Sequence, residues 1–362
     1  MQYKKSIYRY EYAMILILAQ LGSVFLVSIQ ENVLGKDTYF ALLIGLGAGL
    51  ALNAVFLTLL KKTGYQPFAK INLLAFGKFG NVITLAYSAY FLLESAILLN
   101  YYSVFSVEKI LWNLPVGALV ISIVVLVAFS CIKGVTTMGR MGVVFSYVLL
   151  GCVAVSFLCS IPYFDGNNLY PMFQSDTGDF LWMAMLFASL QFGSLVSVLC
   201  VAPYVNQKQK LIRLSLLAAL IGGGIVFLFS FINALVLGDS LIAQDFGFLR
   251  VMRLVDLGGF LTRIETIVIA GYFFATVFRL MIDFFVITNN IDTVLQKNTP
   301  RIKWGVLIGC AVVLIILSQN VPAREFGGNI LQNRWFFIPA AIFQLILPVL
   351  TLALIRKPKA RC

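Results

Sequence analysis

Histidine is absent from this chain of 362 residues, and cysteine is sparse. The absence of histidine removes the commonest metal ligand and the usual proton carrier at neutral pH. Five of the six cysteines lie in apolar runs and none is spaced as C-x-x-C, so neither a disulfide framework nor a zinc site is expected. Paired catalytic carboxylates are also missing, and the glycines of 45–49 neither follow a strand nor open a phosphate loop. We therefore expect no enzyme activity, no cofactor and no bound metal.

Charged residues are scarce as well, at 12% of the chain, whereas hydrophobic residues make up 60%. A soluble domain is about 25% charged and about 45–50% apolar, so a soluble fold of this composition would lack polar surface. The net charge is +12, yet the basic residues lie in short clusters between apolar runs. Such clusters are typical of the signals that orient helices in a membrane, and they do not indicate nucleic-acid binding. The composition therefore favours a protein embedded in the lipid bilayer.

Ten apolar stretches are long enough, or nearly so, to cross a bilayer. A spanning helix needs about 20 mostly apolar residues, because each adds about 1.5 Å across a core of about 30 Å. We expect these helices near Glu11–Ile29, Tyr39–Leu60, Asn81–Tyr102, Val116–Ile132, Met141–Ile161, Phe180–Tyr204, Leu211–Leu237, Ile264–Ile287, Trp304–Ser318 and Trp335–Ile355. The first stretch lacks a small-residue cleavage site and is expected to be retained. The predicted fold is an all-α polytopic membrane protein with a single integral domain over residues 1–362.

Basic residues in the connecting segments predict the orientation of the chain. If the N-terminus is cytoplasmic, most of the 27 lysine and arginine residues fall in inner segments, in clusters around Lys61, Lys208 and Arg301. Positive residues are enriched in the cytoplasmic connections of membrane proteins. This distribution favours cytoplasmic N- and C-termini and an even number of helices.

Two connecting segments are longer than hairpins. The inner segment 61–80 mixes aromatic and aliphatic residues with Lys70 and Lys78, a pattern typical of an interfacial helix. The outer segment 238–263 sets apolar residues around Arg250 and Arg253. This outer segment forms either an amphipathic lid over an outward-facing cavity or a helix that rests on the membrane surface, and the sequence leaves both interpretations open.

Three charged residues fall well inside expected helices, away from the helix ends. A charge at mid-bilayer costs about 2.5–3.5 kcal/mol or more, so it usually faces a cavity or a partner. Arg279 and Asp283 are four residues apart on one helical face, and we expect them to form a structural ion pair. Glu94 shares a stripe with Tyr87 and Tyr90, which would suit the wall of a polar ligand pocket. A functional and a structural role for Glu94 are equally open at this point.

Two polar interruptions lie at corresponding depths in the first and sixth expected helices, as Gln20-Leu21-Gly22-Ser23 and Gln191-Phe192-Gly193-Ser194. The two helices run in opposite directions, as an inverted repeat of five plus five helices over about 11–161 and 180–355 requires. Transporters of this design unwind both helices at the midplane, where the half-helix ends bind the charged groups of a ligand. The alternative is that each Gly-Ser pair only permits close helix packing. The matched positions favour the binding interpretation.

Several segments resemble the B subunits of bacterial spore germinant receptors, a family within the amino acid–polyamine–organocation transporter superfamily. Gln20-Leu21-Gly22-Ser23 is close to the family's Gln-Ile-Gly stretch, and Asn167-Asn168-Leu169-Tyr170-Pro171 is similar to its Asn-Leu-x-Pro turn. The segment 259–265, which ends in Arg263-Ile264-Glu265, resembles its Phe-x-x-Arg-x-Glu motif. The resemblance covers nearly the whole chain. It departs at Val24 and Ile29, where the family has a second glycine and often a proline.

The resemblance implies an amino acid permease fold and a place in the inner membrane of a bacterial spore. It also implies a small germinant, typically an amino acid, as ligand, and receptor A and C subunits as partners. We expect a small zwitterion to dock between the first, third, sixth and eighth helices. The expected ligand-binding residues are Gln20, Gly22, Ser23, Tyr87, Tyr90, Glu94, Gln191, Gly193, Ser194 and Tyr272.

A working secondary amino acid permease is the leading alternative function, and an ion channel opened by partner subunits is a third. Uptake of labelled amino acids by the protein alone would favour the permease. Sustained ligand-gated ion flux in a reconstituted complex would favour the channel, and genes for A and C subunits beside this one would favour the receptor.

Overall fold

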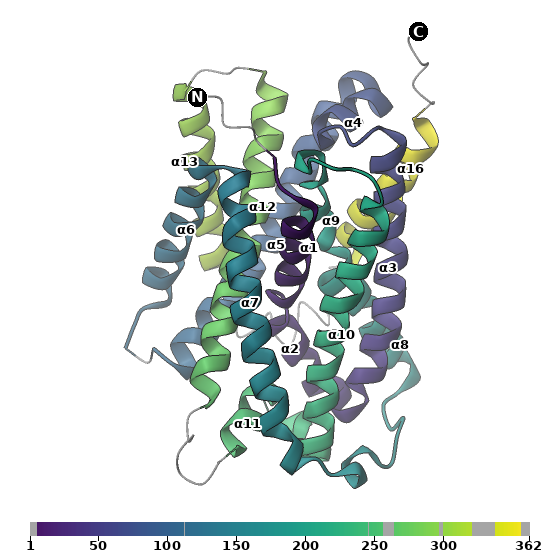
Figure 1. The fold of residues 1–362 in the computed structure, drawn as a ribbon, viewed down its shortest axis with the longest axis vertical. Coiled ribbons are helices and arrows are strands. Elements are labelled where there is room, and N and C mark those ends of the chain that lie inside the picture. The colour runs from purple at the N-terminus through teal and green to yellow at the C-terminus, as the bar shows by residue number, and fades with distance from the viewer. Residues whose placement is uncertain are drawn as a thin grey trace.

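The computed structural model describes residues 6–111, 113–244, 246–255, 264–296, 300–320 and 337–355. In these ranges the chain forms a bundle of helices (Figure 1). The long helices are α3 (Thr38–Lys62), α5 (Gly80–Lys109), α6 (Val116–Lys133), α7 (Val135–Ser160), α10 (Leu211–Leu237), α12 (Ile264–Leu295) and α13 (Pro300–Asn320). The shorter ones are α1 (Arg9–Leu21), α2 (Phe25–Leu34), α4 (Phe68–Phe76), α8 (Thr177–Leu186), α9 (Leu195–Leu199), α11 (Gly247–Leu254), α15 (Phe337–Ala341) and α16 (Leu347–Leu354). Two π-helical segments, η5 (Phe187–Gly193) and η9 (Ile342–Ile346), join α8 to α9 and α15 to α16.

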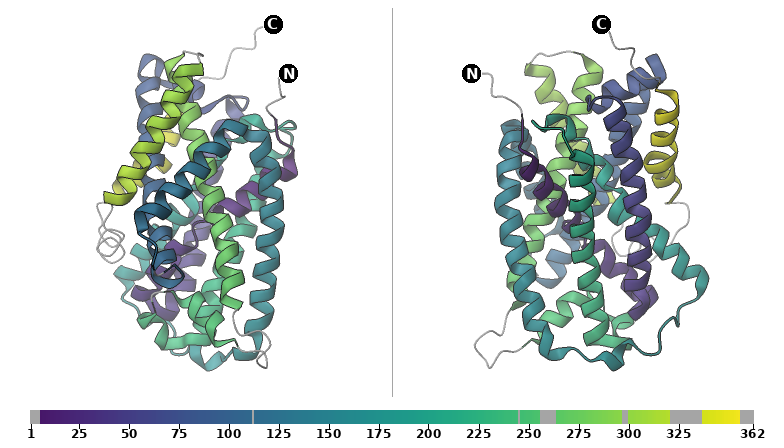
Figure 2. Two further views of the ribbon diagram at one scale, coloured as in Figure 1. Left: turned by 90° about the vertical axis from the view of Figure 1, so that its left-hand side faces the viewer. Right: turned by 45° about the vertical axis from the view of Figure 1, so that its right-hand side comes forward.

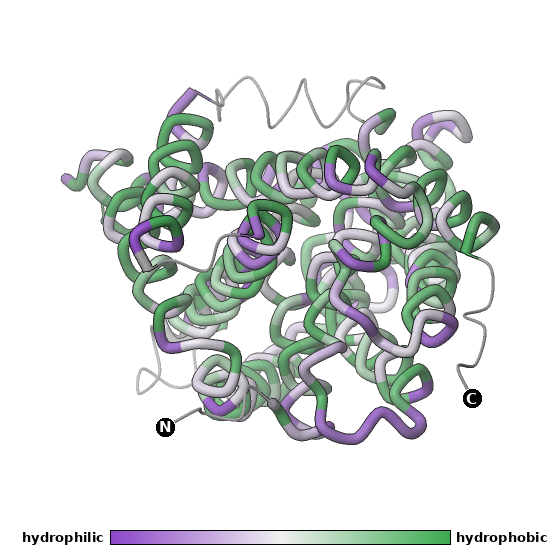
Figure 3. The backbone as a smooth tube through the Cα atoms, turned by 90° about the horizontal axis from the view of Figure 1, so that it is seen from above, coloured by the Kyte–Doolittle hydropathy of each residue, from purple (hydrophilic) through white to green (hydrophobic). Residues whose placement is uncertain are grey.

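Nine helical segments in the described part of the chain are long and apolar enough to cross a membrane. Their outward faces are apolar, and Val125, Val144 and Leu158 are 62%, 59% and 63% exposed. Figure 3, seen along the bundle, shows hydrophobic colours around most of its circumference. Such a surface is stable in lipid because lipid tails are as apolar as the side chains that face them. The chain is an integral all-α membrane protein, as its composition predicts.

Most helix bounds follow the prediction from the apolar runs. The bounds of α10 are the predicted ones, and α3 and α6 differ from prediction by only one or two residues at an end. The predicted short ninth helix is extended at both ends in α13. The first predicted helix is divided into α1 and α2, so it is not among the nine continuous segments. The total of ten crossings therefore stays a prediction.

The two ends of the bundle differ. α1 begins and α16 ends at the same end, beside α4, and α11 lies at the opposite end (Figure 1). Phe248, Val251 and Met252 of α11 are buried against the bundle, whereas Arg250 and Arg253 are exposed. The apolar face of α11 thus covers protein, which favours the lid over the surface helix. The rest of the predicted lid, 256–263, lies outside the described residues.

Burial identifies the centre of the bundle. In Thr177–Tyr204, 94% of the apolar stretch that could span the membrane is buried inside the bundle, and in Ile269–Leu295 the share is 72%. The corresponding shares are only 17% within Arg301–Asn320 and 28% within Val116–Lys133. Polar groups on an enclosed helix must contact protein or line a cavity, because buried polar groups need partners. A site built from polar groups is therefore expected around η5, α9 and α12.

Candidate functional site

The first helix is interrupted at Gly22–Val24, between α1 and α2. α1 ends with an ordinary bond from Gly22 N to Leu18 O at 3.0 Å, and the next two amides then donate three residues back instead of four. α1 and α2 are seen as separate coils in Figure 2. A Cβ at position 22 would lie 2.5 Å from the carbonyl oxygen of Ala275, so glycine lets α12 approach the interruption closely. The interruption forms even though valine occupies position 24, where the resemblance implies a second glycine.

The sixth helix is interrupted close to Gly193. α8 passes into η5, where the amide of Ser194 donates to the carbonyl oxygen of Ser189, five residues back, at 2.9 Å. A new helix, α9, begins at Leu195. Such π-helical turns are found frequently at functional sites. Both interruptions therefore lie where the two polar stretches of the sequence place them.

At both interruptions, side chains donate hydrogen bonds to main-chain carbonyl oxygens. In the hydrocarbon core a carbonyl group without a partner costs several kcal/mol, so a broken helix needs donors. Four are present: Gln191 Nε2 donates to Gln20 O (2.9 Å), Thr276 Oγ1 to Gly22 O (3.0 Å), Asn53 Nδ2 to Phe192 O (3.1 Å) and Arg279 Nη2 to Ser194 O (2.7 Å). These four carbonyl oxygens are therefore already occupied, so a ligand at the interruptions would meet the side chains that bond to them.

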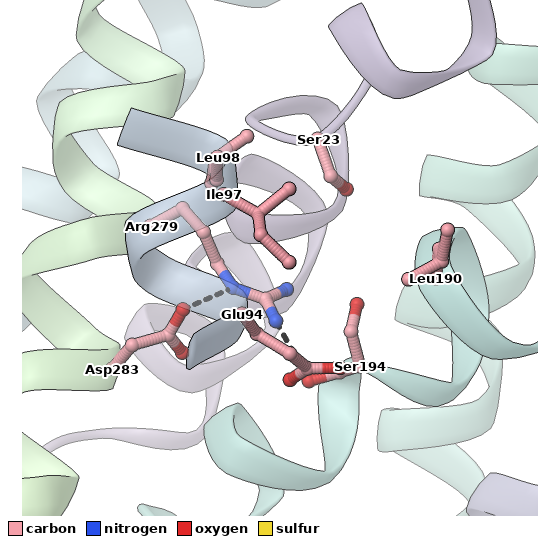
Figure 4. Close-up of a pocket in the computed structure, with 8 residues that line it drawn as sticks. All are labelled: Ser23, Glu94, Ile97, Leu98, Leu190, Ser194, Arg279 and Asp283. Atoms are coloured by element: carbon pink, nitrogen blue, oxygen red, sulfur yellow. Dashed lines mark hydrogen bonds and ion pairs between the residues drawn. The ribbon is translucent and has the colours of Figure 1, made fainter. Parts of the chain in front are cut away.

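A cavity of about 20 Å³ lies between the two interruptions (Figure 4). Its polar walls are Ser23 of the first helix, Glu94 of α5, Ser194 of the sixth helix, and Arg279 and Asp283 of α12. Ile97, Leu98 and Leu190 complete the lining. A space of this size holds about one water molecule. The site is closed to anything as large as an amino acid in this conformation.

The guanidinium group of Arg279 donates to Asp283, Ser194 and Ser197, and one of its three nitrogens makes none of these bonds. Its Nε lies 2.8 Å from Asp283 Oδ2 in an ion pair, and its Nη2 donates to Ser194 O. Ser197 Oγ donates to the second carboxylate oxygen of Asp283. Arg279 Nη1 has no hydrogen-bond partner among the described residues, although the residue is only 2% exposed. In Figure 4 the guanidinium nitrogen without a dashed line points into the cavity.

Ser194 supplies a second free group at the same cavity. Its hydroxyl oxygen is buried and has no partner among the residues that the structure describes. A buried polar group without a partner costs about 1–3 kcal/mol. Two such groups, from Arg279 and Ser194, face one small space. Their arrangement therefore favours an incoming hydrogen-bond acceptor, such as a carboxylate.

Glu94 belongs to a hydrogen-bonded cluster on the cavity wall. Tyr90 Oη donates to Glu94 Oε1 at 2.6 Å, and Gln344 Nε2 donates to Tyr90 Oη at 2.8 Å. Gln344 lies in η9, the π-helical interruption of the last helix. The cluster ties α5 to the last helix and holds the Glu94 carboxyl group at the cavity. A carboxyl group and a guanidinium group therefore face the same space.

The remaining predicted residues do not line the cavity. The side chain of Gln20 packs against α10, where a Cβ on Gly222 would lie 3.1 Å from Gln20 Oε1. Tyr87 Oη donates to Phe343 O at 2.8 Å behind the Glu94 cluster. The ring of Tyr272 lies 5.8 Å from that of Phe248, beneath α11.

Sequence reasoning missed several residues of the site. Arg279 and Asp283 were expected only as a structural pair, yet both line the cavity. Ser197, Thr276 and Gln344 were not singled out at all. The sequence does mark Ser197, Thr276 and Gln344, because each is a single polar residue in an apolar helical stretch that the fold buries.

These features define a class: a helical membrane protein with a transporter fold, in which two interrupted helices meet at a closed polar cavity. The fold is similar to that of a Na⁺-coupled sialic acid symporter solved in its substrate-bound, outward-open state. The TM-score is 0.66 at 13% sequence identity, with 93% of this chain and 79% of the symporter covered. At that identity the likeness concerns the fold alone.

The family follows from the sequence comparison. Residues 6–324 match the spore germination protein family, so the chain belongs to that family. It is also similar to spore germination protein KB of Bacillus subtilis (strain 168), with 21% identity over 345 residues. That match covers 92% of this chain and 90% of the relative. The resemblance found in the sequence is thereby confirmed.

Proposed function

We propose that this chain is the germinant-binding membrane subunit of a spore germinant receptor, and that the cavity takes an amino acid or a similar small zwitterion. The supporting observation is that the unpartnered Arg279 Nη1 and the Glu94 carboxyl group face one cavity. Guanidinium groups bind carboxylates through charge-assisted hydrogen bonds. The ligand carboxylate would pair with Arg279 and Ser194 Oγ, and its ammonium group with Glu94. Membership of the spore germination protein family supports the biological role.

Binding requires that the cavity open. Small-ligand sites usually measure about 300–1,000 Å³, and the described cavity is about 20 Å³. The hydrogen bonds of Gln191 to Gln20 O and of Thr276 to Gly22 O join the helices that would have to separate. A germinant would then act by binding the open conformer more tightly than the closed one. That shift is the signal which the receptor would pass on.

The same proposal places the chain in the spore inner membrane, with cytoplasmic termini and with receptor A and C subunits as partners. The basic residues Lys61, Lys70, Lys78 and Lys208 support the orientation, because positive residues favour the cytoplasmic side. In that orientation α11 covers the outward face of the bundle. The name of the relative, spore germination protein KB, supports a role in germination.

The test is equilibrium binding of a panel of labelled amino acids to the purified protein in lipid vesicles, with uptake measured in parallel. We expect saturable binding without accumulation inside the vesicles. Glu94→Gln should weaken binding at least tenfold, because a neutral amide cannot replace a charge-assisted bond worth about 1.5–3 kcal/mol. Glu31→Gln is the matched control, since Glu31 is buried as well but bonds to Asn233 and does not line the cavity.

Three outcomes separate the functions. Accumulation of an amino acid in vesicles by the chain alone would show that its function is that of a permease and not of a receptor. Folded protein that binds no amino acid of the panel would overturn the ligand class. Equal effects of Glu94→Gln and Glu31→Gln would overturn the site.

A further inference from the structure

A groove of about 710 Å³ opens on the outside of the bundle, between α3 and α10. These two helices lie side by side in Figure 1 and in the right-hand view of Figure 2. The groove is separate from the cavity at Arg279, with which it shares no lining residue. One end of the groove is basic and its walls are apolar. It plays no part in the proposed germinant site.

The basic end consists of Lys61, Lys210 and Arg213. Because α3 ends where α10 begins, all three lie at the end of the bundle that carries α4. All three are exposed, and none has an ion-pair or hydrogen-bond partner within the described ranges. Neither α3 nor α10 contains an acidic residue. Like charges at close quarters repel, so this end of the groove is complementary to an anion.

The walls of the groove are suited to a hydrocarbon chain. Leu217 and Leu220 are 45% and 47% exposed on α10, and Leu50 lies opposite them on α3. From Lys61 to Leu50 the groove follows α3 for about 16 Å, at about 1.5 Å per residue. That length is about half of a hydrocarbon core of about 30 Å, which is the depth of one leaflet. With the cations at headgroup level, the apolar walls therefore cover one leaflet.

We propose that this groove binds an anionic phospholipid, with its phosphate on Lys61, Lys210 and Arg213 and one acyl chain between Leu50 and Leu220. Basic pockets between membrane helices are known to hold anionic lipid headgroups. A free phosphate would use the cations but leave the apolar walls open. The lipid fills both parts of the groove and would hold α3 against α10. α3 also packs against η5 of the sixth helix, and α10 packs against α1 of the first.

The test uses the purified full chain in vesicles of phosphatidylcholine with a small fraction of phosphatidylglycerol, and counts the phosphatidylglycerol retained by mass spectrometry. The triple variant Lys61→Gln, Lys210→Gln, Arg213→Gln should bind that lipid roughly a hundredfold more weakly, because each surface cation contributes about a fivefold gain in affinity. The matched control is Lys70→Gln, Lys78→Gln, Arg140→Gln, which removes three exposed cations from the same end outside the groove. The control should retain the lipid.

Two further arms test the groove itself. Leu217→Trp fills the apolar part without changing charge, and should lower retention at least fivefold. Inorganic phosphate at the lipid's molar concentration should not displace the lipid. Equal loss in both triple variants would reduce the effect to diffuse surface charge and overturn the proposal. Full displacement by phosphate, with no effect of Leu217→Trp, would also overturn it, since the site would then be a simple anion site.

Discussion

Gln191 Nε2 donates to the main-chain carbonyl oxygen of Gln20 at 2.9 Å, so the two interrupted helices are joined directly. Gln191 is 1% exposed and Gln20 is 0% exposed. Gln20 O also accepts from Ser23 Oγ at 3.0 Å, so loss of the Gln191 bond should cost about the net value of one hydrogen bond. Donor and acceptor belong to opposite halves of the predicted inverted repeat. Any opening of the cavity that separates these halves has to break this bond.

The substitution Gln191→Met tests whether that bond holds the site closed. It removes the donor while keeping side-chain length, and should favour the open conformer by about 1 kcal/mol, the usual net value of a hydrogen bond. On the proposed mechanism a germinant binds the open conformer more tightly, so its affinity should rise up to about fivefold. The measurement is germinant binding at equilibrium, together with the melting temperature.

Gln209→Met is the control for Gln191→Met, because the Gln209 side chain is exposed at the surface. Unchanged affinity in Gln191→Met with a lower melting temperature would mean that the bond stabilises both conformers alike. In that case the bond would not be part of the closing mechanism.

The substitution Ser194→Ala tests the free hydroxyl group at the cavity. Ser194 Oγ is buried and unpartnered in the described part of the chain, so its removal costs the closed protein little. The same hydroxyl would bond the ligand carboxylate, and its loss should weaken germinant binding about tenfold or more, as expected for a hydrogen bond to a charged group. Spores that carry the variant should need a correspondingly higher germinant concentration.

Ser189→Ala is a closely matched control. Ser189 lies in η5, the π-helical segment that ends next to Ser194. It is 3% exposed and also has a hydroxyl group without a partner among the described residues, yet it does not line the cavity. It should leave the response to germinants unchanged. Equal shifts in both variants, at equal protein abundance, would attribute the effect to the helix and not to the ligand.

The sequence predicts most of the fold because apolar runs and charged connections are local signals. α10 occupies Leu211–Leu237 as predicted, since Lys208 and Lys210 precede it and Gly238 follows it. The two interruptions were also predictable, because each combines a glutamine with a Gly-Ser pair inside an apolar run. The close approach of α12 to the first interruption could not be predicted, because the contact of Ala275 with Gly22 is a tertiary contact.

The site was predicted less completely. Spacing along a helix shows neither how deep a side chain lies in the bundle nor which hydrogen-bond donors already have a partner. Tyr272 lies seven residues before Arg279, on the same face of α12 but about 10 Å farther along it at about 1.5 Å per residue. It therefore packs beneath α11 and not at the cavity. The free donor of Arg279 was also beyond prediction, because it depends on Ser194 O occupying the neighbouring nitrogen. A pattern of spacing cannot show which donors are already used.

The last prediction separates the two roles of Arg279, as partner of Asp283 and as ligand contact. Arg279→Gln alone leaves the Asp283 carboxylate without its ion-pair partner, and breaking a buried pair in this way costs about 3–5 kcal/mol. We therefore expect low protein abundance. The double variant Arg279→Gln, Asp283→Asn removes both charges and should recover much of that loss, because no unpaired charge is then left buried.

Recovery of abundance in the double variant should not bring back germinant binding, since no guanidinium group remains for the ligand carboxylate. Abundance is measured by immunoblot of the membrane fraction, and binding with the same labelled amino acid that the parent protein binds. Arg279→Lys completes the series: a lysine ammonium cannot serve Asp283, Ser194 O and a ligand in the fixed fork geometry of arginine. It should keep the charge balance yet lose at least tenfold in affinity. A double variant that binds germinant like the parent would confine Arg279 to a structural role and remove it from the site.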